Sequence, residues 1–186
     1  MEITAFLIKI VKILDHLKIP YAITGGMAVS VWGRVRTTAD VDIIVEFTPE
    51  DISGLAKELL QFDKDVYVSE EAIAQALEHK GEFNFVDPNT GLKADFWVVK
   101  DYFNEQEIKR AIAKDFYGYN INFVCPEDLI LSKLLWYKMT ESTRQLEDIE
   151  SVLSISEVNL EQVRDLAQKQ GTLDILEILI KKAEEK

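Results

Sequence analysis

Residues 21–26 read Tyr-Ala-Ile-Thr-Gly-Gly, and residues 40–45 read Asp-Val-Asp-Ile-Ile-Val. These two stretches decide the fold. The first predicts a short strand over 21–24 that breaks at the glycine pair and leads into a helix over 27–32. The second opens a β-branched, apolar run that predicts a strand over 41–47. Together they indicate an α+β (α/β-like) domain, with a short mixed sheet and flanking helices.

Two aspartates, Asp40 and Asp42, stand at the start of the second strand. Side chains alternate across a strand, so both carboxylates point to the same face. Two like charges this close repel each other unless a cation lies between them. Mg²⁺ prefers oxygen ligands and takes one or two carboxylates together with substrate phosphates. The pair therefore predicts a magnesium site.

The glycine pair, Gly25 and Gly26, fits the same chemistry. Glycines between a strand and a helix let the backbone approach a ligand closely. The helix that follows offers free N–H groups and the positive end of its dipole to phosphate oxygens. We therefore predict that a phosphate group binds at this turn, beside the strand that carries the aspartates.

A third carboxylate, Asp95, interrupts the apolar run over residues 92–99. A lone charge with apolar neighbours is costly to bury unless it is paired or bound to a metal. Three carboxylates on adjacent strands could hold two Mg²⁺ ions, which activate an attacking hydroxyl and neutralise a leaving pyrophosphate. The alternative is an ion pair of Asp95 with Lys93 or Arg110.

The order of these residues resembles the DNA polymerase beta-type nucleotidyltransferase superfamily, in which a glycine pair, Asp-x-Asp and a distant lone Asp follow one another. Residues 21–42 are similar to the small bacterial nucleotidyltransferases, which include the minimal nucleotidyltransferases and the abortive-infection toxin enzymes. Residues 126–134, with Arg144 and Asp148 further on, resemble the helical part that follows the catalytic core in those proteins. The resemblance covers most of the chain, from Leu14 to Leu153.

The resemblance implies an enzyme that moves a nucleotide monophosphate from a nucleoside triphosphate to an acceptor hydroxyl or phosphate. It implies that Asp40 and Asp42 bind both metal ions, and that Asp95 binds the catalytic metal and helps to deprotonate the acceptor. It also implies that Gly25 and Gly26 contact the triphosphate. Many members have Gly-Ser at this turn, so Gly26 departs from the pattern and offers only its backbone.

Three further residues are candidate substrate contacts. Arg36 either steers the triphosphate or pairs with an acidic neighbour on a strand. Thr38 either supports an aspartate through a hydrogen bond or belongs to a turn. Lys133 lies on an apolar helix, where a solvated lysine is the alternative to a phosphate contact. Arg144 and Asp148 are four residues apart on a helix, which favours a structural ion pair between them.

The composition limits the partners. The chain has 186 residues and a net charge of −12, from 33 acidic and 21 basic residues. A broad basic surface for nucleic acid is absent, which argues against extended nucleic-acid binding. There is one cysteine, no apolar run of membrane-spanning length and no signal-peptide order, so we expect a cytoplasmic protein without a membrane partner. The acceptor stays open between a small molecule, a protein and tRNA.

The layout predicts two regions. Residues 1–125 are expected to form the core with the sheet, and residues 126–186 a C-terminal helical bundle. A helix over 2–17, a helix capped by Ser69 and two hairpins complete the first region. The acidic surface and helical tail also suit a protein partner, as in toxin–antitoxin pairs. A catalytically idle module of the same fold is therefore the alternative to an enzyme.

Overall fold

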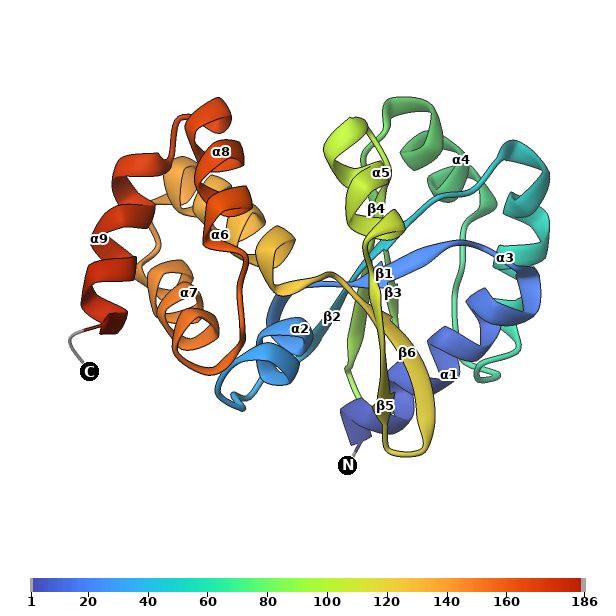
Figure 1. Cartoon of the computed structure of the whole chain (residues 1–186). Coiled ribbons are helices and arrows are strands. Elements are labelled where there is room, and N and C mark those ends of the chain that lie inside the picture. The colour runs from blue at the N-terminus through green and yellow to red at the C-terminus, as the bar shows by residue number, and fades with distance from the viewer. Residues whose placement is uncertain (1, 185–186) are drawn as a thin grey trace. The chain divides into compact units, whose positions relative to one another are not determined.

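The computed structural model describes residues 2–184 and contains a sheet with helices, followed by a helical region (Figure 1). Residues 1, 185 and 186, at the ends of the two expected regions, lie outside the described residues. The elements in chain order are α1 (Glu2–Leu17), β1 (Tyr21–Ile23), α2 (Gly25–Trp32), β2 (Asp40–Val45), a short 3-10 helix (Pro49–Asp51), α3 (Ile52–Leu60), α4 (Glu70–His79), β3 (Glu82–Val86), β4 (Lys93–Val98), α5 (Tyr102–Lys109), β5 (Ile112–Phe116), β6 (Tyr119–Phe123), α6 (Pro126–Thr140), α7 (Thr143–Ile155), α8 (Leu160–Gln170) and α9 (Leu173–Glu184).

The chain divides into two compact units. The first contains the residues up to Gly26 and those from Thr38 to Val124. The second contains Met27–Thr37 and the residues from Cys125 onward. The domain boundary between residues 125 and 126 that the sequence suggests stays a prediction.

The sheet of the first unit is mixed, which confirms the α+β class. Its strand order is β3-β4-β2-β1-β6-β5. β2 runs parallel to β4, and β1 runs parallel to β6, while the remaining neighbours are antiparallel. β1 therefore ends at the same edge of the sheet at which β2 and β4 begin. Both hairpins expected from the sequence, β3–β4 and β5–β6, are present.

One face of this sheet is covered by apolar packing. β3 and β4 show the period of two that a half-buried sheet requires, because every second residue of each strand is buried. Phe85 on the buried face lies 6.1 Å from the ring of Phe6 on α1 and 5.1 Å from that of Phe62. Leu7, Ile10 and Leu14 of α1 have no exposed surface. This core leaves the alternate residues of β2 and β4 for the opposite face.

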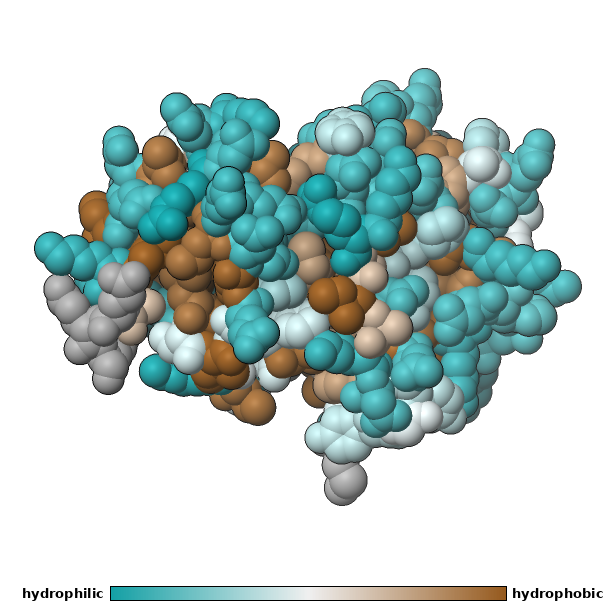
Figure 2. All heavy atoms as spheres, viewed as in Figure 1, coloured by the Kyte–Doolittle hydropathy of each residue, from teal (hydrophilic) through white to brown (hydrophobic). Residues whose placement is uncertain are grey.

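The second unit is built from helices. α6 lies against α7 and α8, and α9 packs on the same two helices. Figure 2 shows that hydrophobic side chains also reach the surface among these helices. The core of this unit contains Leu129, Ile130, Leu131, Leu134, Ile149, Val152, Val163, Ala167, Leu176 and Leu179.

The structure differs from the sequence prediction in the bounds of several elements and in one additional helix. β1 ends at Ile23, one residue before the expected end, and α2 begins at Gly25, two residues before the expected start. β2 covers Asp40–Val45, so the strand begins at the first aspartate and stops two residues before the expected end. α5 was not expected, because its sequence has no apolar repeat. Within residues 2–184, no helix has the length and apolar character that a membrane span requires.

Candidate functional site

The glycine turn is packed directly on one of the aspartates. The backbone N–H of Thr24 donates to the carbonyl oxygen of Asp42 at 2.9 Å, which ties the end of β1 to β2. Gly25 follows with φ of 59°, in the left-handed region that favours glycine. A Cβ at this position would lie 2.6 Å from Cγ of Asp42. The fold therefore requires glycine here for two reasons, the backbone angle and the neighbouring carboxylate.

The register of β2 and β4 brings the three aspartates to one edge of the sheet. Asp42 faces Asp95, and Asp40 faces Lys93. Neighbouring strands lie about 4.8 Å apart, so these side chains are close neighbours on one face. Asp40 is exposed, whereas Asp42 and Asp95 are half-buried. The two aspartates of β2 and the distant Asp95 are thus close together in space, beside Gly25.

A lysine carries the positive charge in this cluster. Lys93 Nζ lies 2.8 Å from Oδ2 of Asp95, so the ion pair that the sequence left open is present. The hydrogen bond to Asp95 raises the pKa of Lys93 above its usual value, and the charges of Asp95, Asp40 and Asp42 act in the same direction. The ammonium group is therefore paired with Asp95, and the other two aspartates add to the attraction.

The donor set matches the ligands that Mg²⁺ prefers. All three side chains offer carboxylate oxygens, and the missing side chain of Gly25 lets the carboxylate of Asp42 pack against the turn. Among residues 2–184, no three His, Cys, Asp or Glu side chains already converge as a group that could hold a metal ion. The aspartates thus suit Mg²⁺ because they offer oxygen ligands and lie on neighbouring strands. To bind the ion, their side chains would have to turn toward a common point.

A cavity lies elsewhere in the first unit. It measures about 700 Å³ and lies beside the edge strand β3, with Tyr67, His79 and Asn84 in its wall. It contains none of the three aspartates. Asn84 faces Asp95 across the β3–β4 pairing, so the cavity adjoins the strand next to the carboxylates. The candidate site is defined by its side chains and not by this pocket.

Thr38 has a turn role in the structure. Its hydroxyl donates to the backbone carbonyl oxygen of Asp40 at 3.1 Å. The bond fixes the chain just before β2 begins, and it is directed to the backbone of Asp40 and not to its carboxylate. A contact of Thr38 with a substrate stays a prediction.

Arg36 and Lys133 meet in the second unit on one buried carboxylate. Arg36 Nε lies 2.9 Å from Oδ1 of Asp148, and its Nη2 donates to Oδ2 at 3.1 Å. Lys133 Nζ lies 2.9 Å from the same Oδ2. The side chains of Asp148 and Lys133 are only 4% and 10% exposed. Arg36 and Lys133 therefore share the carboxylate of Asp148. A contact of either residue with a substrate phosphate stays a prediction.

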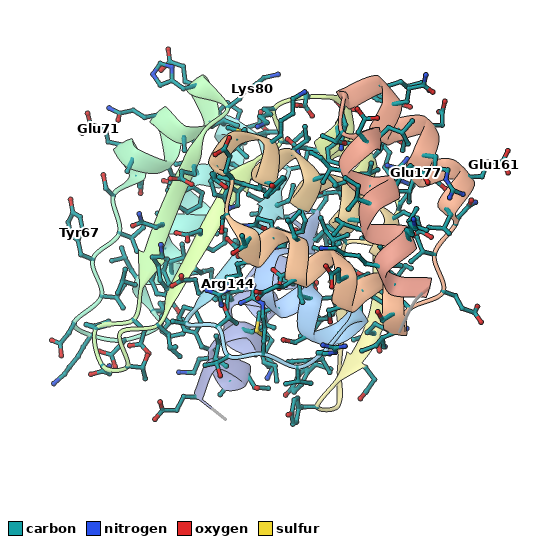
Figure 3. The ribbon with its side chains drawn as sticks, turned by 90° about the vertical axis from the view of Figure 1, so that its left-hand side faces the viewer. Tyr67, Glu71, Lys80, Arg144, Glu161 and Glu177 are labelled. Atoms are coloured by element: carbon teal, nitrogen blue, oxygen red, sulfur yellow. The ribbon has the colours of Figure 1, made fainter. Side chains whose placement is uncertain are left out.

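This cluster corrects three interpretations of the sequence. Lys133 is buried and paired, so the solvated-lysine alternative is wrong. Arg36 pairs with a helical aspartate and not with a neighbour on a strand. Asp148 pairs with Arg36 and Lys133, so the expected pair with Arg144 is wrong; Arg144, labelled in Figure 3, donates to the carbonyl oxygen of Thr37 at 3.4 Å. The signal for Lys133 was its position between Leu131 and Leu134 on an apolar helix face.

A family model described as "Nucleotidyltransferase of unknown function (DUF6036)" matches residues 1–182. The chain belongs to this family. The nucleotidyltransferase class suggested by the motifs is thereby confirmed at the level of family, and the aspartates and glycine turn described above occupy the matched region. None of the curated proteins matches the chain in sequence.

Solved structures show the same fold in other nucleotidyltransferase-like proteins. The solution structure of the antibiotic-resistance factor ANT(2'')-Ia has a TM-score of 0.56, with 15% identity over 94% of each chain. An antigenic nucleotidyltransferase-like protein from Paracoccidioides brasiliensis has a TM-score of 0.53, with 22% identity over 94% of this chain and 91% of that one. At these identities the likeness shows the fold alone and does not extend to activity or substrates.

Proposed function

We propose that the protein is a Mg²⁺-dependent nucleotidyltransferase that moves a nucleotide monophosphate from a nucleoside triphosphate to an acceptor hydroxyl or phosphate. The observation that carries the proposal is that Asp42 faces Asp95 on the neighbouring strand. Asp42 lies two residues after Asp40 on β2 and directly beside the turn at Gly25. Carboxylates in this arrangement next to a helix N-terminus suit a metal-bound triphosphate. The family to which the chain belongs supports the same reaction class.

Each residue has a separate task in the proposed reaction. The backbone at Gly25 and Gly26 receives the phosphates, because it lies at the start of α2 and carries no side chain. Asp40, Asp42 and Asp95 hold Mg²⁺, which when bound neutralises charge on the leaving pyrophosphate. Asp95 also accepts the proton of the acceptor. The acceptor oxygen then bonds to the α-phosphorus as the bond to the β-phosphate oxygen breaks, and pyrophosphate leaves.

The charge distribution favours a small or protein acceptor. A net charge of −12 repels a long phosphate backbone. Incubation with labelled nucleoside triphosphates, Mg²⁺ and cell extract, followed by separation of RNA, protein and small molecules, identifies the acceptor class. We expect label in the small-molecule or protein fraction. Label confined to tRNA would contradict this expectation.

The metal and triphosphate site is tested by calorimetric titration with Mg²⁺ and each of the four nucleoside triphosphates. Asp40→Asn and Asp42→Asn should lose binding while their melting temperatures stay close to that of the parent. Asp65→Asn is the matched control, because Asp65 is an exposed aspartate of the same unit. If Asp40→Asn and Asp42→Asn bind like the parent, the site lies elsewhere.

Thermal unfolding with and without each Mg²⁺-triphosphate separates the enzyme from the idle module that the sequence leaves as an alternative. A triphosphate that binds the folded state raises the melting temperature by mass action. We expect such a shift for at least one Mg²⁺-triphosphate. A melting temperature that none of them changes would favour a module that acts in protein recognition.

A further inference from the structure

One lysine of the first unit, Lys93, lies among the acids of the candidate site without belonging to the expected ligand set. Its ammonium group is 2.8 Å from Asp95, and its Cα faces that of Asp40 across the β2–β4 register. The side chain of Lys93 is 37% exposed, whereas that of Asp95 is 14% exposed. Lys93 is thus the more exposed member of the pair.

We propose that Lys93 is a built-in counter-cation of the carboxylate site, which weakens the binding of free divalent ions and reserves the site for a metal that arrives with a triphosphate. The inference rests on the proposed function, since it concerns the same three aspartates. It assigns a role in metal selectivity to a residue that neither the motif nor the family description includes.

The physical reason is competition for the same oxygens. An ammonium group and a divalent cation near the same carboxylates repel each other. The bond between Lys93 and Asp95 joins two charged groups, which makes it stronger than a neutral hydrogen bond. A free ion must therefore displace Lys93 or share Asp95 with it. A triphosphate changes this balance, because its negative charge offers Lys93 another partner as the metal enters.

The same contact has a consequence for stability. Asp40, Asp42 and Asp95 are three like charges on adjacent strands, and Lys93 offsets part of their repulsion. Removing the ammonium group should lower the melting temperature in EDTA. Addition of a divalent ion should then restore it, because the ion takes over the role of the lysine.

The test measures Mn²⁺ affinity by electron paramagnetic resonance, with and without a non-hydrolysable ATP analogue. Lys93→Met should bind free Mn²⁺ about tenfold more tightly than the parent, which is about 1.4 kcal/mol. Lys93→Arg keeps the charge and should bind Mn²⁺ like the parent. Lys57→Met removes the same charge from an exposed site on α3 and should also leave the affinity unchanged. The analogue should increase Mn²⁺ affinity in the parent more than in Lys93→Met.

The outcomes separate this inference from the proposed function. If the parent binds Mn²⁺ and Lys93→Met binds it with equal or lower affinity, the role of Lys93 is wrong and the metal site stands. If neither protein binds Mn²⁺ with or without the analogue, the metal site and the inference both fail. Lys93→Gln, which keeps a polar side chain, replaces Lys93→Met should the latter not fold.

Discussion

A side-chain carbon on Gly25 would overlap the carboxylate of Asp42. Two features of the backbone hold this contact in place. The N–H of Thr24 donates to the backbone carbonyl oxygen of Asp42, and Gly25 has a left-handed conformation. The glycine of the turn and the aspartate of the strand therefore form one structural unit. A change at the glycine should act on the position of the carboxylate as well as on stability.

Gly25→Ala should weaken Mg²⁺-triphosphate binding at least tenfold, because the methyl group displaces Asp42. It should also lower stability by about 1–2 kcal/mol through its left-handed backbone. Gly91→Ala is the matched control, because Gly91 has φ of 70° but nothing within 4 Å of an added Cβ. Calorimetric titration and thermal unfolding measure the two effects. Equal binding by both variants would show that the contact with Asp42 is irrelevant to the ligand.

The thiol of Cys125 should be inert in the folded protein. Burial raises its pKa to about 12, and the charge of Asp128 acts in the same direction. Only the thiolate attacks a disulfide reagent, so reaction with Ellman's reagent at pH 8 should be far slower in the native protein than in urea. Rapid labelling of the native protein at pH 8 would contradict the burial of this side chain.

The sequence predicted those elements whose pattern is local. The apolar repeat of α1 and the cap at Ser69 both correspond to elements in the structure. α5 was missed because its residues include Asn104, Glu105 and Gln106 and show no apolar repeat. Its signal was Asp101, whose Oδ1 accepts a hydrogen bond from the backbone N–H of Asn104 at 3.0 Å. A cap without an apolar stripe was too weak a pattern to indicate a helix.

In the candidate site, too, the local features could be predicted from the sequence, and the long-range pairings could not. Alternation along β2 placed Asp40 and Asp42 on one face, and the charge of Asp95 within an apolar run marked it as unusual. The partners of Asp148 were not predictable, because Arg36 lies 112 residues away in sequence. Helical spacing favoured Arg144, which is local. Pairings that depend on how distant segments meet follow from the fold and not from the spacing.

The cap of α4 gives a local test of stability in the first unit. Ser69 has an extended backbone, and its Oγ accepts a hydrogen bond from the backbone N–H of Ala72 at 3.1 Å. Ser69→Ala should cost about 1 kcal/mol, whereas Ser69→Asp should keep the cap. Urea unfolding measures the difference. Equal stability of Ser69→Ala and the parent would show that the hydrogen bond contributes nothing to stability.

Asp148 should be highly sensitive to substitution, because it is buried with two cations around it. Removing it leaves Lys133 and Arg36 without their shared anion in a buried position, so Asp148→Ala should cost about 3 kcal/mol or more. Lys133→Met should cost less, because the ion pair of Arg36 with Asp148 and the hydrogen bond from its Nη2 remain. Glu147→Ala is the matched control, since Glu147 is exposed and adjacent in sequence.

The double variant Lys133→Met/Asp148→Ala, with the two single variants and the parent, forms a double-mutant cycle that measures the interaction between the two residues. If the two residues interact directly, the double variant should be less destabilised than the sum of the two single variants, since Asp148→Ala no longer leaves a buried ammonium group. Urea unfolding of all four proteins measures the interaction. Purely additive effects would show that Lys133 and Asp148 do not stabilise each other, and would favour a role for Lys133 outside this ion pair.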